Sequence, residues 1–184
     1  SGNVGTLKSW TLNLIGNADS SDDTYVYSDE YAEALASKTE RGTLSDSGGT
    51  DTLNAAMATG RVVIDLNPGA SSTIDGALLK IATGTTLENA WGGDGNDSLT
   101  GNAAVNKLFG GRGNDRLNGG GGNDAIDGGA GVDTADFNGQ RASFLVTRTS
   151  TGWTVEDRVG SQGRDTVASV ERLEFDNIGL AFDL

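Results

Sequence analysis

The chain has 184 residues, with 26 acidic against 13 basic side chains and a formal net charge of −13. This charge disfavours nucleic acid as a partner, which needs a basic face, and the absence of histidine excludes a His-based triad, a zinc-protease motif and a His general base. Cysteine is also absent, so no disulfide stabilises the fold, and no apolar run is long enough to cross a membrane.

The first 91 residues predict short strands, one helix and polar loops. Residues 1–16 alternate apolar and polar side chains between Trp10 and Leu14, which is typical of a strand. An acidic loop follows at residues 17–24. A helix is predicted at residues 29–39, with Ser28 as its N-cap. Strands are predicted at residues 25–27 and 61–66, a turn at 67–69, and a strand or a helical turn at 77–82.

Residues 92–136 divide into five blocks of nine in unbroken phase: GGDGNDSLT, GNAAVNKLF, GGRGNDRLN, GGGGNDAID and GGAGVDTAD. Position one is always glycine. Position six is occupied by Asp97, Asn106, Asp115, Asp124 and Asp133, and position eight by Leu99, Leu108, Leu117, Ile126 and Ala135. A flexible glycine-rich linker has no reason to keep this phase. A dinucleotide-binding GxGxxG loop needs a helix after the glycines, and none is predicted.

Each of these nonads predicts six loop residues followed by three strand residues. Glycine adopts φ > 0 freely, so alternating glycines can direct successive carbonyls to one point, and the position-six carboxylate adds a charged oxygen. Calcium binds about six to eight oxygens in loose geometry, which suits such loops. Two nonads then make one turn of a flattened spiral, with loops one, three and five stacked on one edge and loops two and four on the other. The repeat resembles the calcium-binding parallel β-roll of RTX proteins.

The C-terminal segment, residues 137–184, is not predicted to contain nonads. Residues 141–159 predict a hairpin that turns near Ser150 to Gly152. Solenoids need caps that bury their terminal layers, so this hairpin and a strand near 170–176 are the expected C-terminal cap. Its core residues are predicted to be Phe144, Val146, Trp153, Val155, Val167, Val170, Leu173 and Phe175.

Three segments over roughly residues 20–136 resemble the C-terminal β-roll domain of serralysin-type secreted proteases. They are DSGGTDTL (46–53), VIDLNPGASSTIDG (63–76) and GTTLENAWGGDGNDSLTGNAAVNKLFGG (84–111). The zinc-binding catalytic domain of that family is absent from this sequence. Separately, GTLKSWTLNLIG (5–16) resembles the last strand of the P domain that follows subtilisin-like catalytic domains; the alternative is a cap strand of the roll itself.

The resemblance implies calcium ligands before the nonads. The family's D-x-G-G-x-D loop and T-x-E pair match Asp46, Gly48, Gly49, Asp51, Thr86 and Glu88. A D-T dipeptide further upstream matches Asp23-Thr24. There the implied ligands are backbone carbonyls, including those of Ser20, Asp22 and Thr24, although Ser20 and Asp22 replace the family's Arg and Gly.

Within the nonads, the resemblance implies that an ion binds positions two, four and six of one loop and positions one, three and six of the loop two nonads later. The first ion is assigned to Gly93, Gly95 and Asp97 with Gly110, Arg112 and Asp115. The second is assigned to Gly111, Gly113 and Asp115 with Gly128, Ala130 and Asp133. The third is assigned to Asn102, Ala104 and Asn106 with Gly119, Gly121 and Asp124. Because Asn106 replaces a carboxylate, the third site is expected to be the weakest. The alternative for each aspartate is a solvated turn residue.

The predicted fold is therefore all-β, a parallel β-roll (an RTX solenoid) with flanking strand and hairpin caps. It divides into a terminal strand at 1–16, which ends a preceding P domain if that resemblance holds, the N-terminal part of the roll domain at 17–91, the nonads at 92–136, and a C-terminal cap at 137–184. The Leu-Ala-Phe-Asp-Leu ending is similar to the export signals of type I secretion. The alternative is a final strand of the cap, and both can hold.

The predicted function is a non-catalytic, calcium-binding C-terminal module of a secreted bacterial protease, located outside the cell. The resemblance implies that it folds on binding about five calcium ions, supports type I secretion and stabilises its parent enzyme. Its expected partners are calcium, the type I (ABC) secretion apparatus and the parent's catalytic domain, with no nucleic acid and no membrane insertion. One alternative is a calcium-dependent adhesion or carbohydrate-binding module, which an exposed aromatic patch around Trp153 would favour. Another is an enzyme that uses a calcium-free carboxylate pair in a cleft.

Overall fold

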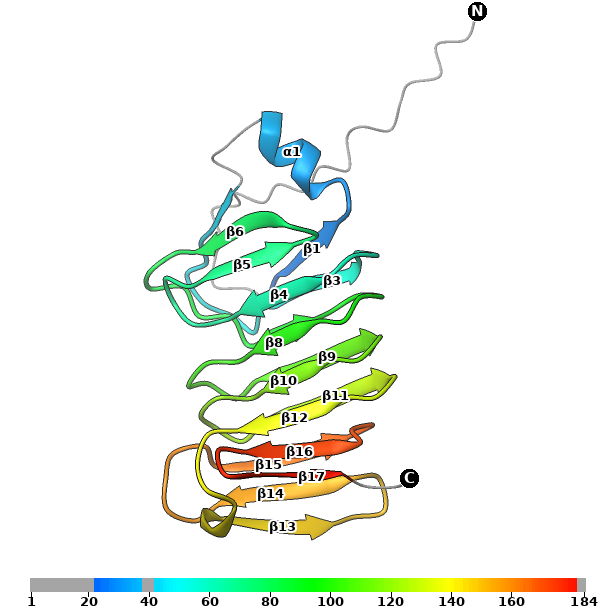
Figure 1. Ribbon diagram of the computed structural model, residues 1–184. Helices are drawn as coiled ribbons and strands as arrows, with labels where there is room; N and C mark the ends of the chain where they lie inside the picture. Colours follow the sequence, from blue (N-terminus) through cyan, green and yellow to red (C-terminus); the bar gives the residue numbers. More distant parts are fainter. Residues whose placement is uncertain (1–21, 38–41, 182–184) are drawn as a thin grey trace, which may run out of the picture.

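The computed structural model describes residues 22–37 and 42–181, and these form the predicted all-β fold. Two sheets run along an elongated stack of strands, with helix α1 (Tyr31–Ser37) at one end and strand β13 at the other (Figure 1). The predicted strand at 1–16 and the expected ligand Ser20 lie outside the described residues. Among the described residues, no helix has the length and apolar composition needed to span a membrane.

The first sheet has the order β1-β3-β7-β9-β11-β15-β14-β13. Its strands are parallel from β1 to β15, and β14 and β13 are added antiparallel. Their bounds are Thr24–Ser28 for β1, Thr52–Met57 for β3, Asn89–Trp91 for β7, Lys107–Arg112 for β9, Ala125–Ala130 for β11, Arg164–Ala168 for β15, Trp153–Asp157 for β14 and Phe144–Arg148 for β13.

The second sheet has the order β17-β16-β12-β10-β8-β4-β5-β6-β2. It is parallel from β16 to β4, with antiparallel strands added at both ends and β2 parallel to β6. The bounds are Ile178–Ala181 for β17, Arg172–Phe175 for β16, Thr134–Phe137 for β12, Arg116–Asn118 for β10, Ser98–Thr100 for β8, Val62–Asp65 for β4, Ser71–Ile74 for β5, Ala77–Ile81 for β6 and Thr43–Leu44 for β2.

From β7 to β12 the chain alternates between the two sheets, so that each turn of the roll uses two nonads, as predicted. The position-eight residues are buried and stack in register inside the roll: Leu108 pairs with Ile126, and Leu99 with Leu117. Each layer therefore buries its apolar residues against the neighbouring layers, which is how a solenoid obtains a continuous core.

The prediction that residues 137–184 contain no nonads needs correction. After the inserted residues 137–159, β15 and β16 return to the roll and extend it, with Val167 in register with Ile126 and Leu173 with Ala135. The insertion breaks the nine-residue phase along the sequence, but parallel pairing restores the register in space.

The predicted hairpin is confirmed as β13 and β14, with its turn between Arg148 and Trp153. Together with β16 it forms the expected C-terminal cap, in which the rings of Phe137, Phe144 and Phe175 lie 5.1–5.8 Å apart. All of the predicted core residues of this cap are buried or half-buried. The predicted helix is confirmed over Tyr31–Ser37, where Tyr31 packs edge-on against Tyr27 at the opposite end of the roll.

Strands β2, β3, β5 and β7 were not predicted. Their inward residues include small or polar side chains. Ser72 of β5, for example, is fully buried because its hydroxyl accepts a hydrogen bond from the Asp65 backbone N–H at 3.0 Å. Such strands lack the apolar alternation that identifies a half-buried strand in a sequence.

Candidate metal sites

The position-six side chains form a ladder of hydrogen bonds along each edge of the roll. On one edge, the Asp97 backbone N–H donates to Asp115 Oδ1 at 2.8 Å, and the Asp115 N–H donates to Asp133 Oδ1 at 2.7 Å. On the other edge, the Asn106 N–H donates to Asp124 Oδ1 at 2.8 Å. Alternate loops therefore stack as predicted, and each position-six side chain lies between its own loop and the loop before it.

The ladders, and Asp51 before them, leave carboxylate oxygens without a hydrogen-bond partner. In the part of the chain that the structure describes, the buried Oδ2 atoms of Asp51, Asp115, Asp124 and Asp133 receive no hydrogen bond. Burying an ionised carboxylate is costly unless a cation or enough donors compensate it. These oxygens therefore mark positions that a cation fits.

The same burial shifts the pKa values of these carboxyl groups. Desolvation raises the pKa of Asp115 to about 7 and those of Asp51 and Asp124 to about 6, and it also raises the pKa of Asp133. The available donors are carboxylate and carbonyl oxygens, with no cysteine or histidine in the chain. An all-oxygen set suits calcium better than zinc or copper.

Close stacking of the loops depends on glycine at position four. Gly113 has φ +116°, and a Cβ on it would lie 2.0 Å from the carbonyl oxygen of Gly95 in the preceding loop of the same edge. At position five, the Asn96 side chain accepts the Asn114 N–H, and the Asn114 side chain accepts the Val132 N–H, each at 2.8 Å. These contacts hold the expected carbonyl ligands of successive loops against one another.

Two members of the predicted nonad sites are already satisfied by the protein. Both carboxylate oxygens of Asp97 accept backbone N–H groups, from Val62 at 2.8 Å and from Gly93 at 2.7 Å. The Asn106 carbonyl oxygen accepts the Asn102 N–H at 2.8 Å. Neither side chain leaves a buried oxygen without a partner.

The second nonad replaces charge with amide groups. Asn102 Nδ2 donates to the Leu87 carbonyl at 2.8 Å, and Asn106 Nδ2 donates to the Glu88 carbonyl at 3.0 Å. Amide donors thus link the second nonad to the segment before the nonads. Among the described side chains of the third predicted site, Asp124 alone supplies a buried unpartnered oxygen, which is consistent with the expectation that this site is weakest.

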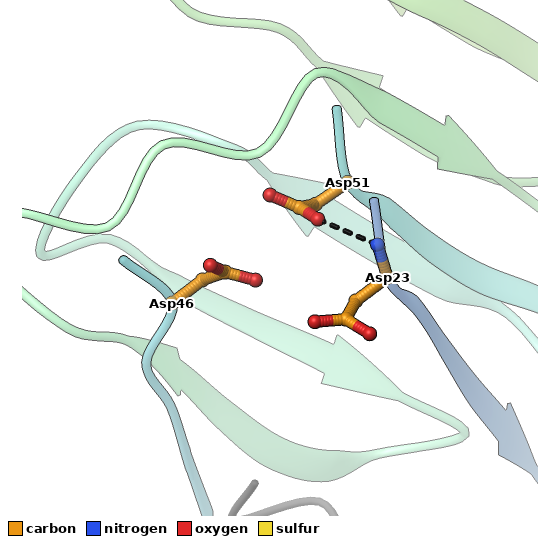
Figure 2. A group of neighbouring side chains, drawn as sticks. All are labelled: Asp23, Asp46 and Asp51. Atoms are coloured by element: carbon orange, nitrogen blue, oxygen red, sulfur yellow. Dashed lines mark hydrogen bonds between the residues drawn. The ribbon is translucent and has the colours of Figure 1, made fainter. Parts of the chain in front are cut away.

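A separate carboxylate cluster lies before the nonads, where Asp23, Asp46 and Asp51 offer oxygens within 4.8 Å of one another (Figure 2). The Asp23 N–H donates to Asp51 Oδ1 at 2.8 Å, and Tyr25 donates its hydroxyl proton to Asp46 Oδ2 at 2.5 Å. Glu88 Oε2 accepts the Asp51 N–H at 2.7 Å, so this carboxylate lies beside the group of three. Like charges this close favour a bound cation.

The cluster differs in detail from the expected ligand set. The Asp23 carboxylate was missed, although its D-T dipeptide was the signal for this region. The Asp22 side chain accepts the Thr50 N–H at the surface, and the backbone carbonyl of Asp22 stays a predicted ligand. Thr86 is exposed, and the buried hydroxyl of its neighbour Thr85 accepts the Asp46 N–H at 3.0 Å. Gly48 and Gly49 form the turn between the two buried aspartates, with φ +143° and +128°.

Comparison with known proteins agrees with this geometry. The RTX calcium-binding nonapeptide repeat family matches residues 87–117 and 100–135. Over residues 87–135 the roll is therefore similar to RTX calcium-binding repeats. The unpartnered Oδ2 atoms of Asp115, Asp124 and Asp133 all lie within this part of the roll.

Curated relatives are also similar over part of the chain. Serralysin of Photorhabdus laumondii is 41% identical over 94 residues, which cover 50% of this chain and 18% of the relative. Metalloprotease AprA of Pseudomonas entomophila is 45% identical over 65 residues, covering 34% of this chain and 13% of the relative. The chain thus spans less than a fifth of the length of these relatives.

Proposed function

We propose that this chain is a non-catalytic calcium-binding module of a secreted protease and that it folds on binding calcium. The main support for this proposal is the set of buried carboxylate oxygens without a hydrogen-bond partner, at Asp51, Asp115, Asp124 and Asp133. In the calcium-free chain, folding must bury these oxygens uncompensated. Calcium binds only where stacked loops bring oxygens together, so metal binding and folding are coupled.

The proposal assigns ions to the spaces between stacked loops. One ion lies in the Asp23, Asp46 and Asp51 cluster with Glu88. Two lie between Asp97 and Asp115 and between Asp115 and Asp133, and a weaker one lies between Asn106 and Asp124. In the nonads, the backbone carbonyl oxygens at positions two and four of one loop and one and three of the loop two nonads later complete each shell. Calcium binds about six to eight oxygens in all.

The similarity to serralysin and metalloprotease AprA supports a protease as the parent protein. In this proposal the module leaves the cell unfolded through a type I exporter, where cytosolic calcium is low, and folds outside. Ligand binding at about a hundred times its Kd would stabilise the folded module by about 2.7 kcal/mol per site. That free energy stabilises the parent enzyme after export.

The test is far-UV circular dichroism of the chain during a calcium titration, with magnesium as the control. We expect a cooperative transition from coil to strand with calcium and none with magnesium, because magnesium demands tighter octahedral geometry and gives up its water reluctantly. A chain that is fully folded in EGTA and unchanged by calcium would refute the coupling. Isothermal calorimetry of the folded sample then counts the ions.

One observation favours an accessory binding module as a second candidate. Trp91 and Phe109 lie in register on adjacent strands and are 41% and 39% exposed. A groove of about 820 Å³ extends from them to Trp153. Exposed aromatic rings in a row suit stacking against sugar rings. Quenching of tryptophan fluorescence by a soluble oligosaccharide, lost in Trp91→Ala, would support this candidate, and an unchanged spectrum across a panel of glycans would reject it.

A further inference from the structure

The roll continues past the five nonads after the hairpin insertion. Residues 160–168, GSQGRDTVA, carry glycine at positions one and four, Asp165 at position six and Val167 at position eight. The segment lies next to the fourth nonad, because β15 pairs in parallel with β11. It therefore occupies the place that a sixth loop would take on the edge formed by loops two and four.

The second half of this loop repeats the contacts of the nonads. The Arg164 N–H donates to Asn123 Oδ1 at 2.8 Å, which matches the position-five ladder. Gly163 has φ +74°, and a Cβ on it would lie 2.0 Å from the Gly122 carbonyl oxygen, as found for Gly113 over Gly95. Positions four to eight of residues 160–168 thus have nonad geometry.

Asp165 continues the position-six ladder. It is 2% exposed, and its Oδ1 accepts the Asp124 N–H at 2.8 Å, so its carboxylate lies between the loop at 119–124 and the loop at 160–165. Among the hydrogen bonds and ion pairs of the described residues, none involves its Oδ2, but this oxygen is not one of the fully buried unpartnered atoms found in the nonads. Burial, and then the nearby charges of Asp124 and Asp157, raise the pKa of Asp165 to about 7.

The first half of the loop is built differently. Asp157 folds it by accepting the backbone N–H groups of Val159, Gly160 and Gln162 at 2.8–3.2 Å. A Cβ on Gly160 would meet the Asp157 carboxylate. In the nonads, a Cβ on the first glycine would instead meet the position-six carboxylate of its own loop, as Gly110 would meet Asp115. Carbonyl ligands to an ion here must therefore come mainly from the loop at 119–124.

We propose that Asp165 holds a further calcium ion between these two loops, together with carbonyl oxygens of Gly120 and Gly122. This inference rests on the proposed calcium binding of the nonads and extends it by one site. The site closes the edge of the roll next to the C-terminal cap, so its occupancy would couple the β13–β14 hairpin region to calcium.

The first test compares calcium stoichiometry by calorimetry in the full chain, Asp165→Asn and Asp176→Asn. The asparagine keeps an oxygen for the Asp124 N–H but loses the charge. Asp176 is exposed, lies in the same cap and makes no side-chain hydrogen bond or ion pair among the described residues, so its variant controls for the loss of one charge. We expect Asp165→Asn to bind one calcium ion fewer and Asp176→Asn to bind the full number. Full stoichiometry in Asp165→Asn would overturn the site.

A second measurement decides the case in which Asp165→Asn fails to fold. Crystals of the unmodified chain grown with calcium should show an anomalous peak between Asp124 and Asp165. Peaks between Asp97, Asp115 and Asp133 without one at Asp165 would overturn this inference alone. Absence of every peak between the loops would overturn the proposed calcium function itself.

Discussion

At the residue scale, the two oxygens of one carboxylate have different tasks. In Asp115, Oδ1 accepts the backbone N–H of Asp97 in the preceding loop of the same edge, and Oδ2 is buried without a partner. The first oxygen fixes the stacking of the loops, and the second is left for a cation. An asparagine can perform the first task but brings a donor where the cation would lie.

The substitution Asp115→Asn separates these two tasks. We expect the calcium midpoint of folding to rise by about tenfold or more, corresponding to at least about 1.4 kcal/mol, because Asp115 serves two proposed ions. The measurement is calcium-titrated circular dichroism. Glu156→Gln removes one charge from β14, outside the loops, and should leave the calcium midpoint unchanged. An equal shift of the midpoint in both variants would show that the effect comes from net charge and not from a calcium ligand.

The raised pKa values predict an unusual pH dependence without calcium. Because the pKa values of Asp51, Asp115 and Asp124 in the folded chain are about 6 to 7, above that of an ordinary aspartate, protonation favours the folded state. This stabilisation is full below the unfolded pKa of about 4 and is lost as pH rises through 6 to 7. In EGTA, strand content should therefore increase as pH falls from 7.5 to about 5. A strand signal that falls on acidification over this range would contradict the prediction.

At the scale of elements, the hairpin β13–β14 protects the open end of the roll. Phe144 is buried against Phe137 and Phe175, whereas Leu145 on the same strand is 42% exposed. The neighbouring residues of one strand thus point to a shared aromatic core and to solvent. The packing of Phe144 in this aromatic core stabilises the cap.

Phe144→Ala should destabilise the calcium-bound chain by about 3–5 kcal/mol, the usual cost of deleting a buried aromatic ring. Leu145→Ala is the matched control and should change the free energy of unfolding by less than about 1 kcal/mol. Urea denaturation in saturating calcium gives both values. Equal losses in the two variants would show that Phe144 does not anchor the cap.

At the scale of the whole molecule, a net charge of −13 opposes compaction, but the charge is of two kinds. Exposed carboxylates repel one another through solvent. The ladder carboxylates are buried, and each lies beside a neighbouring loop. Salt screens the first kind strongly and the second much less.

We therefore expect that 1 M sodium chloride, with a Debye length of about 3 Å, does not fold the calcium-free chain, whereas millimolar calcium does. Circular dichroism in EGTA with and without salt tests this. Complete folding in sodium chloride alone would mean that general repulsion, and not the loop sites, keeps the chain unfolded.

The repeat, the β-roll and the candidate loops were predictable from the order of the residues. A glycine, an aspartate and an apolar residue in fixed phase allow few structures other than stacked turns, because each residue type has a separate steric or electrostatic role in the loop and strand. The hairpin at 141–159 was also predictable, from its alternation.

Which oxygens are left for a cation depends on contacts between segments that are far apart in the chain. Asp97 and Asp115 look equivalent in the sequence, yet the Val62 and Gly93 N–H groups satisfy the first, whereas the second keeps a free oxygen. Asp165 joins the ladder only because parallel pairing of β15 with β11 bridges the inserted hairpin. Except for the bond from Gly93, which lies in the same loop as Asp97, these hydrogen bonds join segments 18 or more residues apart. Their partners are therefore set by stacking in space and not by spacing along the chain.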